Sequence, residues 1–206
     1  DAGPLAIGEA LAGRGLLGPD IEAPPGLRIP GAWDAFELGV RAILGQQVTV
    51  RGASTLAARL VRAFGKPVAG APAGLSHLFP SPALLAGADV ASLGLPRARA
   101  AAIRNFAGAV ARGELLLDGA RGLDDAVTRL SAVPGIGSWT AQYIALRALG
   151  EPDAFPAGDL ALRKALGRGG KTITAAQAER LAADFRPWRS YAAMALWQSL
   201  ALKELQ

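Results

Sequence analysis

The chain has 206 residues, of which 51% are hydrophobic, and it carries a formal net charge of +5. This length predicts one large domain or two closely packed lobes, with enough apolar residues for a substantial helical core. The absence of cysteine excludes disulfides, thiolate zinc sites and cysteine-ligated iron–sulfur clusters, and the single histidine, His77, excludes a histidine-rich metal centre. An enzyme of this composition has to work with carboxylates, aromatic rings and backbone groups.

The basic excess is concentrated in the middle of the chain. Residues 34–150 hold 12 Lys and Arg against 7 Asp and Glu, whereas residues 1–33 hold 2 against 4 and residues 151–206 hold 8 against 6. A basic segment of this kind is typical of a surface that faces polyanionic phosphate. A well-solvated, arginine-rich protein would show the same excess, so charge alone leaves both interpretations open.

The sequence shows neither a membrane-spanning nor a secretory pattern. Its longest uncharged stretch, residues 67–88, is interrupted by four prolines. The first residues, Asp1-Ala2-Gly3-Pro4, lack a basic-then-apolar signal pattern. We therefore expect a cytoplasmic protein without a membrane partner.

The periodic stretches of the first half predict helices. Asp34 followed by Glu37 is a capping-box pattern. The helix that it opens carries apolar residues on one face, at Phe36, Val40, Ile43 and Leu44. Further helices are expected over residues 50–64, with Gly65 as the stop, after Ser81-Pro82, and after Pro96, the last of these carrying Arg97, Arg104 and Arg112.

The second half continues in the same way. Two helices, over residues 123–132 and 138–149, flank the turn Pro134-Gly135-Ile136-Gly137. Thr174 with Gln177 predicts a capping box for a helix that ends near residue 185, and a last helix is expected over residues 191–203, after Pro187. No stretch alternates β-branched residues as a strand would. The predicted fold class is all-α.

The turn between the helices at 123–132 and 138–149 is the sharpest local signal. Its glycines, Gly135 and Gly137, allow positive φ and a close approach of the backbone to another molecule. The N–H groups of the turn and of the next helix's first residues then form an anion site suited to a DNA phosphate. A plain helical hairpin with a glycine-rich turn is the alternative that this motif alone leaves open.

With its flanks, the hairpin resembles a known family. The matching segments are Arg28-Ile29-Pro30-Gly31, Asp34-Ala35-Phe36-Glu37, Arg41-Ala42-Ile43-Leu44-Gly45-Gln46-Gln47-Val48, Leu93-Gly94-Leu95, Asp153-Ala154-Phe155-Pro156 with Asp159, and Trp188-Arg189-Ser190-Tyr191-Ala192. The chain resembles, over essentially its whole length, the helix–hairpin–helix (HhH-GPD) DNA glycosylase superfamily, and within it the AlkA-type 3-methyladenine DNA glycosylases.

The resemblance implies a two-lobed helical glycosylase fold with a DNA-binding cleft between the lobes. Lobe one is expected at about residues 35–151 and lobe two at about residues 1–34 plus 152–206 of a single glycosylase domain. AlkA-type proteins usually carry a preceding mixed α/β domain, whereas this chain opens partway through that arrangement. The sequence is therefore either a fragment or a member of a lineage without that domain.

Asp159 is the expected catalytic residue. It precedes a helical run, where aspartate is a preferred N-cap, and the N–H groups of a helix start stabilise the ionised carboxylate. The resemblance implies that this carboxylate stabilises the oxocarbenium-like sugar, or orients the attacking water, as the base leaves. The sequence leaves open which of the two contributions is larger.

The resemblance also assigns the residues that hold DNA and the flipped base. A base pocket is expected from Trp139, Tyr143 and Trp197, and a wedge from Gln47, where AlkA-type enzymes typically have leucine. Without the resemblance, aromatic residues at helical spacing predict a helix core and Gln47 a polar helix end. The hairpin residues expected to bind DNA phosphate are Pro134, Gly135, Ile136, Gly137, Ser138 and Thr140.

Trp139 stands where lyase members of the superfamily carry a Schiff-base lysine, so base removal without strand cleavage is expected. Gly158 is a further departure, because some relatives have an acidic residue there. No cofactor and no catalytic metal are expected. A structural Na⁺ or K⁺ at the backbone carbonyls of Ser131, Val133 and Ile136 is left open.

The function that follows is a monomeric, nucleoid-associated DNA repair enzyme. Its substrates are expected to be alkylated purines in double-stranded DNA, of the 3-methyladenine and 7-methylguanine type, excised by base flipping and N-glycosidic hydrolysis. Two alternatives are a different branch of the superfamily and a DNA-binding module without activity. Other branches of the superfamily need a four-cysteine cluster or the lysine, both absent here, and a non-catalytic helix–hairpin–helix DNA-binding module would need neither Asp159 nor the aromatic pocket.

Overall fold

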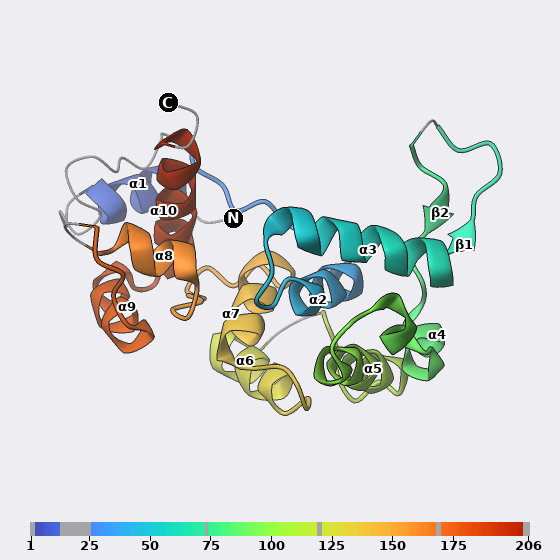
Figure 1. Cartoon of the computed structure of the whole chain (residues 1–206). Helices are drawn as coiled ribbons and strands as arrows, with labels where there is room; N and C mark the ends of the chain where they lie inside the picture. Colours follow the sequence, from blue (N-terminus) through green and yellow to red (C-terminus); the bar gives the residue numbers. More distant parts are fainter. Residues whose placement is uncertain (1–2, 13–25, 73, 119–120, 168–169, 204–206) are drawn as a thin grey trace. The chain divides into compact units, whose positions relative to one another are not determined.

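The computed structural model describes residues 3–12, 26–72, 74–118, 121–167 and 170–203. Over these residues its regular secondary structure is helical apart from one short strand pair, which confirms the all-α class (Figure 1). The chain divides into two compact units, Ala32–Thr140 and the combination of Asp1–Gly31 with Ala141–Gln206. The lobe boundaries expected from sequence, 35–151 and the remainder, stay a prediction.

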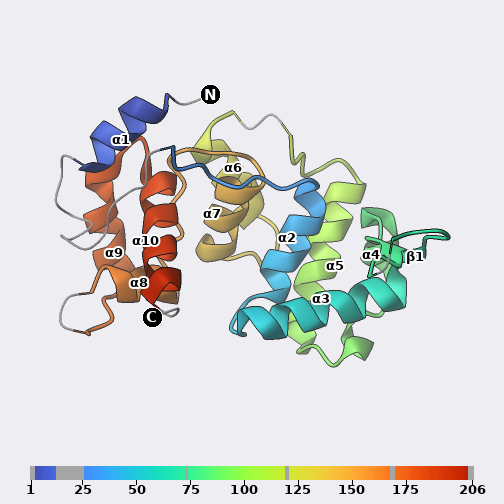
Figure 2. The same ribbon diagram turned by 90° about the horizontal axis from the view of Figure 1, so that it is seen from above.

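The first unit, Ala32–Thr140, is built around a long helix, α5. Helix α2 packs along α5, and α3 and α4 pack against α2 and α5 respectively (Figure 2). The ring of Phe36 on α2 stacks on that of Phe106 on α5, with 5.6 Å between centroids. The elements of this unit are α2 (Ala35–Leu44), α3 (Val50–Phe64), β1 (Lys66–Pro67), β2 (His77–Leu78), α4 (Pro82–Gly87), the 3-10 turn η1 (Val90–Leu93), α5 (Arg97–Ala111), α6 (Leu123–Ser131) and the start of α7 (Ser138–Arg147).

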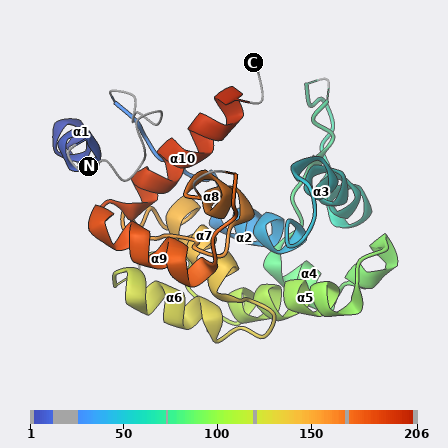
Figure 3. The ribbon, with the colours of Figure 1, turned by 60° about the vertical axis from the view of Figure 1, so that its left-hand side comes forward.

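The second unit combines the remainder of α7 with the two ends of the chain. Helix α8 packs against both α9 and α10 (Figure 3). Three of its fully buried side chains are Phe155, Leu162 and Phe185. Its elements besides α7 are α1 (Pro4–Ala12), α8 (Leu160–Ala165), α9 (Ala175–Ala182), the 3-10 turn η2 (Ala183–Phe185) and α10 (Arg189–Lys203).

Polar N-cap side chains begin several of these helices, and the one at Thr49 was not predicted. Each accepts a hydrogen bond from a backbone N–H in the first turn, which would otherwise lack a partner. Thr174 and Gln177 form the complete capping box that was predicted. Asp34 forms only half of its predicted box, because the Glu37 carboxylate pairs with Arg41 instead. The N-caps with such a bond are Asp34, Thr49, Ser81, Asp159 and Thr174.

The strand pair was not predicted. Lys66 pairs with Leu78 and Pro67 with His77 in an antiparallel register, and the Val68 N–H donates to the Ser76 carbonyl at 2.9 Å. Strands of two residues are too short to show the alternation by which a sequence reveals a strand.

Gly65 ends α3 as predicted, but not for the reason that a helix-stop glycine suggests. Its φ is −76°, outside the left-handed region. A Cβ at this position would collide with the carbonyl oxygens of Val61 and Leu78, so glycine is needed for the close approach of two backbones.

Candidate functional site

Asp159 begins α8 in the second unit, and its carboxylate is half-buried. The Oδ1 atom accepts two hydrogen bonds, from the backbone N–H of Leu162 at 3.0 Å and from the indole Nε1–H of Trp197 at 3.2 Å. The first bond is the N-cap predicted from sequence, and the second joins the carboxylate to α10. These two donors fix the position of Oδ1.

Two predicted pocket residues lie together in this unit. The rings of Tyr143 on α7 and Trp197 on α10 meet edge to face, with 6.2 Å between centroids and 65° between planes. Through Trp197 they connect directly to Asp159. The second unit therefore brings together three of the residues that the sequence assigned to catalysis and base binding. Trp139, the third predicted pocket residue, lies one turn earlier on α7, in the first unit, and is half-exposed.

Arg147 is a neighbour of Tyr143 that the sequence analysis missed. Its guanidinium lies 5.9 Å from the centroid of the Tyr143 ring, and its Nη1 donates to the Tyr143 hydroxyl at 3.4 Å. Its Nε donates to the Pro30 carbonyl at 2.8 Å. The four-residue spacing between Tyr143 and Arg147 on one helix was the signal that could have identified it.

The segment that leads to Asp159 is held by a buried ion pair. Arg189, at the start of α10, has a side chain that is only 3% exposed and pairs bidentately with Asp153, with both distances 2.9 Å. Its remaining Nη1 donates to Glu179 on α9 at 2.7 Å. Arg186 also contacts Asp153 at 2.9 Å, but from a side chain that is 60% exposed. Asp153 and Arg189 lie in separate segments of the sequence, and the structure joins these segments.

Two uncharged side chains hold the same segment. The Ser190 hydroxyl lies 2.7 Å from the carbonyl oxygens of both Glu151 and Ala154. The Gln142 side chain accepts the Phe155 N–H at 2.9 Å. These contacts satisfy backbone groups of an irregular segment, most of which is buried or half-buried. The cost of burial raises the pKa of the Glu151 carboxyl above its ordinary value of 4.5.

The glycine-rich hairpin belongs to the first unit, and one of its two glycines has the positive φ and close backbone approach expected from the sequence. Gly135 has φ +96°, and a Cβ there would collide with Ala102 of α5. The close approach that requires glycine at position 135 is therefore made within the protein itself. A Cβ at Gly137 would meet no heavy atom within 4 Å, and its φ lies outside the positive region. The structure alone gives no reason for a glycine at position 137.

The hairpin presents mainly its backbone. The side chains of Val133 and Ile136 are buried, and the Ile136 N–H donates to the Val133 carbonyl at 3.0 Å. Thr140 is 2% exposed, and its hydroxyl accepts a hydrogen bond from Gln46. What these positions can offer a phosphate is therefore main chain rather than side chain. Pro134, Gly135, Gly137 and Ser138 are all exposed.

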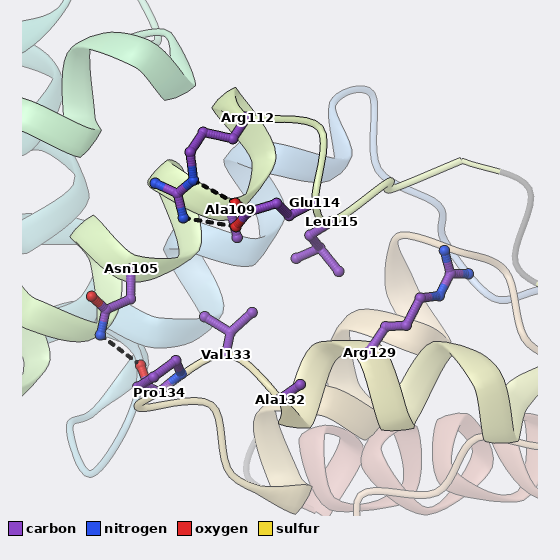
Figure 4. A pocket seen from close by; sticks show the side chains of 9 residues that line it. All are labelled: Asn105, Ala109, Arg112, Glu114, Leu115, Arg129, Ala132, Val133 and Pro134. Carbon is purple, nitrogen blue, oxygen red and sulfur yellow. Dashed lines mark hydrogen bonds and ion pairs between the residues drawn. The ribbon is translucent and has the colours of Figure 1, made fainter.

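A side chain of helix α5 supports the hairpin. Asn105 donates from Nδ2 to the Pro134 carbonyl at 3.1 Å (Figure 4). Asn105 and Pro134 also line a pocket of about 350 Å³ that reaches the exposed Arg112–Glu114 ion pair. The hydrogen bonds between these two side chains raise the pKa of Arg112 and lower that of Glu114, and their opposite charges act in the same directions. None of the predicted aromatic pocket residues lines this cavity.

Gln47 lies in the loop between α2 and α3. It is exposed, and its φ is +54°, a positive value that residues other than glycine rarely adopt. Gln46 precedes it and reaches the hairpin, with its Nε2 at 2.9 Å from the Thr140 hydroxyl and 3.3 Å from the Gly135 carbonyl. Sequence analysis named Gln47 and gave Gln46 no role.

The described residues contain neither a candidate membrane span nor a cluster of metal-binding side chains. In this part of the chain no helix is long and apolar enough to cross a membrane. Within the same ranges, no group of three or more His, Cys, Asp or Glu side chains is placed to hold a metal ion.

Comparison with known proteins identifies the family. Residues 40–190 match the HhH-GPD superfamily of base excision DNA repair proteins. The chain is 44% identical over 200 residues to a probable bifunctional transcriptional activator/DNA repair enzyme AlkA of Mycobacterium tuberculosis, covering 97% of this chain and 40% of the relative. It is 40% identical to DNA-3-methyladenine glycosylase 2 of Escherichia coli, covering 89% and 64% of the two chains.

A solved structure shows the same fold. The 3-methyladenine DNA glycosylase of Archaeoglobus fulgidus superimposes with a TM-score of 0.76 at 26% identity, covering 95% of this chain and 69% of that one. The chain thus belongs to the HhH-GPD superfamily of base excision DNA repair proteins. It spans about two fifths of the length of the mycobacterial relative and 64% of the Escherichia coli relative.

Proposed function

We propose that the protein is a monofunctional DNA glycosylase, which flips alkylated purines out of double-stranded DNA and hydrolyses their N-glycosidic bond. The observation that carries the proposal is the position of the Asp159 carboxylate, held by a helix N–H and by an indole beside a second aromatic ring. The names of the similar Escherichia coli and Archaeoglobus proteins support 3-methyladenine as a substrate.

Asp159 supplies the negative charge that the reaction needs. As the base departs, positive charge develops on the sugar, and a carboxylate nearby stabilises it electrostatically or orients a water molecule for attack. The Leu162 N–H and the Trp197 indole hold Oδ1 in place before the substrate arrives. A carboxylate that is already oriented does not need to reorganise as the reaction proceeds.

The aromatic rings account for the preference for alkylated bases. Purines such as 3-methyladenine and 7-methylguanine carry a formal positive charge, and the faces of indole and phenol rings attract cations. The Tyr143 ring already lies beside the Arg147 guanidinium. Stacking contributes roughly 1–3 kcal/mol per base, which helps to offset the cost of extrusion.

The hairpin would hold the DNA by its phosphates. The exposed backbone at Gly135, Gly137 and Ser138, with the N-terminal end of α7, provides N–H groups and a partial positive charge. Open space outside Gly137 allows a phosphate to approach where a side chain would obstruct it. Such contacts position the protein on DNA without reading its sequence.

No strand cleavage is expected, because position 139 is a tryptophan and has no amine to form a Schiff base.

In this proposal the protein acts as a monomer near the nucleoid and needs no cofactor. A structural Na⁺ or K⁺ at the Ser131, Val133 and Ile136 carbonyls fits the chemistry of the turn. The Val133 carbonyl accepts one N–H and keeps a second lone pair.

The decisive test is the release of bases from methylated DNA. The wild-type protein is expected to release free 3-methyladenine and 7-methylguanine, detected by chromatography, and to leave the strands intact. Asp159→Asn keeps the N-cap, since asparagine caps as well as aspartate, but it removes the charge. It should lower the excision rate by roughly 100-fold or more while DNA binding persists.

Asp89→Asn is the matched control. Asp89 is an exposed aspartate that also precedes a helical turn, η1, but its side chain makes no capping bond. This variant should retain wild-type excision. Equal activity in Asp159→Asn and wild type would remove Asp159 from the mechanism. Binding of DNA without any release by the wild-type protein would identify the alternative, a non-catalytic DNA-binding module.

A further inference from the structure

The loop between α2 and α3 is tied to the hairpin by one side chain. Gln46 donates from a single nitrogen, Nε2, to the Thr140 hydroxyl at 2.9 Å and to the Gly135 carbonyl at 3.3 Å. These contacts join segments that lie 94 and 89 residues apart in the sequence. The partner on α7 is 2% exposed, so this hydrogen bond is largely shielded from water.

The same residue is held from a third direction. The guanidinium of Arg99, on α5, donates to the Gln46 backbone carbonyl. Both ends of Gln46 therefore have protein partners, the backbone on α5 and the side chain on the hairpin. A loop residue with its backbone and side chain both bonded has little freedom to reorient.

The contacts of Gln46 also restrain the backbone of the next residue, Gln47. Its φ of +54° is unfavourable for a residue with a side chain, and such a conformation persists only where the surroundings hold it. Strained backbone of this kind is concentrated at functional sites. The two hydrogen bonds of the Gln46 side chain and the Arg99 contact are the interactions that hold the residue directly before it.

We infer that Gln46 is a positioning residue, which fixes the Gln47 loop to the phosphate-binding hairpin. The loop and the hairpin then contact DNA at a fixed distance from each other. The inference rests on the proposed function, because it assigns Gln47 to the gap left by a flipped nucleotide. Gln46 itself touches no DNA in this role. Its amide spaces the loop from the hairpin and keeps Gln47 pointing outward.

The first test is independent of DNA. Gln46→Met keeps the length of the side chain and removes the amide. Hydrogen exchange of the free protein should become faster at residues 45–49 and 135–140 together, and remain unchanged in α9. Exchange unchanged in both segments would overturn the link between them. This outcome does not depend on whether the protein is a glycosylase.

The second test uses a duplex with a stable abasic analogue and an undamaged duplex of the same sequence, with binding followed by fluorescence anisotropy. Loss of the two hydrogen bonds should weaken binding of the abasic duplex about tenfold. Binding of the undamaged duplex, which relies on phosphate contacts, should change less than about twofold. Equal weakening on both duplexes would show a merely structural role and overturn the inference.

A double-mutant cycle shows whether Gln46 acts through Gln47. The loss of abasic-duplex affinity in the double variant Gln46→Met with Gln47→Ala should match that of Gln47→Ala alone, whereas independent roles would give the product of the two losses.

Thr140→Val should weaken abasic binding in the same direction and Thr140→Ser should not, which provides a second route if Gln46→Met fails to fold. A wild-type protein without preference for the abasic duplex would refute the proposed function, and the exchange experiment would still decide the link.

Discussion

The two candidate functional segments share uncharged supports and differ in an ion pair, which holds the segment that leads to Asp159. The hairpin in the first unit is held by neutral side chains, Gln46 and Asn105, and by the contact of Gly135 with Ala102. The segment leading to Asp159 in the second unit is held by the buried Arg189–Asp153 pair. Uncharged supports place no competing anion beside a phosphate site, whereas an ion pair with strict geometry suits a carboxylate that has to stay in place.

The largest effect is expected from breaking the charged support. Arg189→Met leaves Asp153 half-buried without its bidentate partner, and should lower the free energy of unfolding by about 3–5 kcal/mol. Arg186→Met is the matched control, because Arg186 contacts the same carboxylate from a 60% exposed side chain. Its loss should stay below about 1 kcal/mol. Chemical denaturation measures both, and equal losses would show that burial does not distinguish the two arginines.

The neutral support gives a smaller effect on stability. Gly135→Ala imposes a side chain on a φ of +96° and a collision with Ala102, and should destabilise the fold by about 1–3 kcal/mol. Gly137→Ala meets no atom of the protein and should leave stability within about 0.5 kcal/mol of wild type. We expect it instead to weaken binding of undamaged DNA several-fold. Thermal melting and anisotropy on both variants separate the folding role of one glycine from the binding role of the other.

The smallest effect is expected at Glu151, which lies in the segment that leads to Asp159. Burial disfavours the negative charge of its carboxylate. Because its pKa is raised in the folded protein, folding is favoured by protonation, and stability is lost as pH rises from 4.5 through the raised pKa. Glu151→Gln should therefore raise the melting temperature slightly at pH 7 and leave it unchanged below pH 4.5. A lower melting temperature at pH 7 would show that the ionised carboxylate stabilises this segment.

Local features were the ones that sequence could predict. The Thr174–Gln177 capping box, the turn at Gly135 and the N-cap at Asp159 each depend on residues within one helical turn, so a short pattern is enough to reveal them. The pairing of β1 with β2 was missed because a two-residue strand carries no period. The function of Asp159 came from the resemblance, since an N-cap aspartate alone has a sufficient structural explanation.

Contacts that join segments distant in the sequence could not be predicted from the sequence. Arg189 and Asp153 lie 36 residues apart, and Gln46 and Thr140 lie 94 apart. Nothing in the spacing of such residues indicates a contact, because the contact depends on how whole helices pack. Tyr143 and Trp197 were named by resemblance, but the indole hydrogen bond to Asp159 appears only in the structure.

The double role of Asp159 affects how activity is inferred from other sequences. A carboxylate that caps a helix contributes to folding whether or not any reaction takes place. Selection for stability alone would therefore preserve an aspartate at this position in a chain that had lost its enzyme activity. The indole donor contributed by a separate helix, α10, is not needed to cap α8. The pair of Asp159 and Trp197 is thus a stricter marker of a working glycosylase than the aspartate alone.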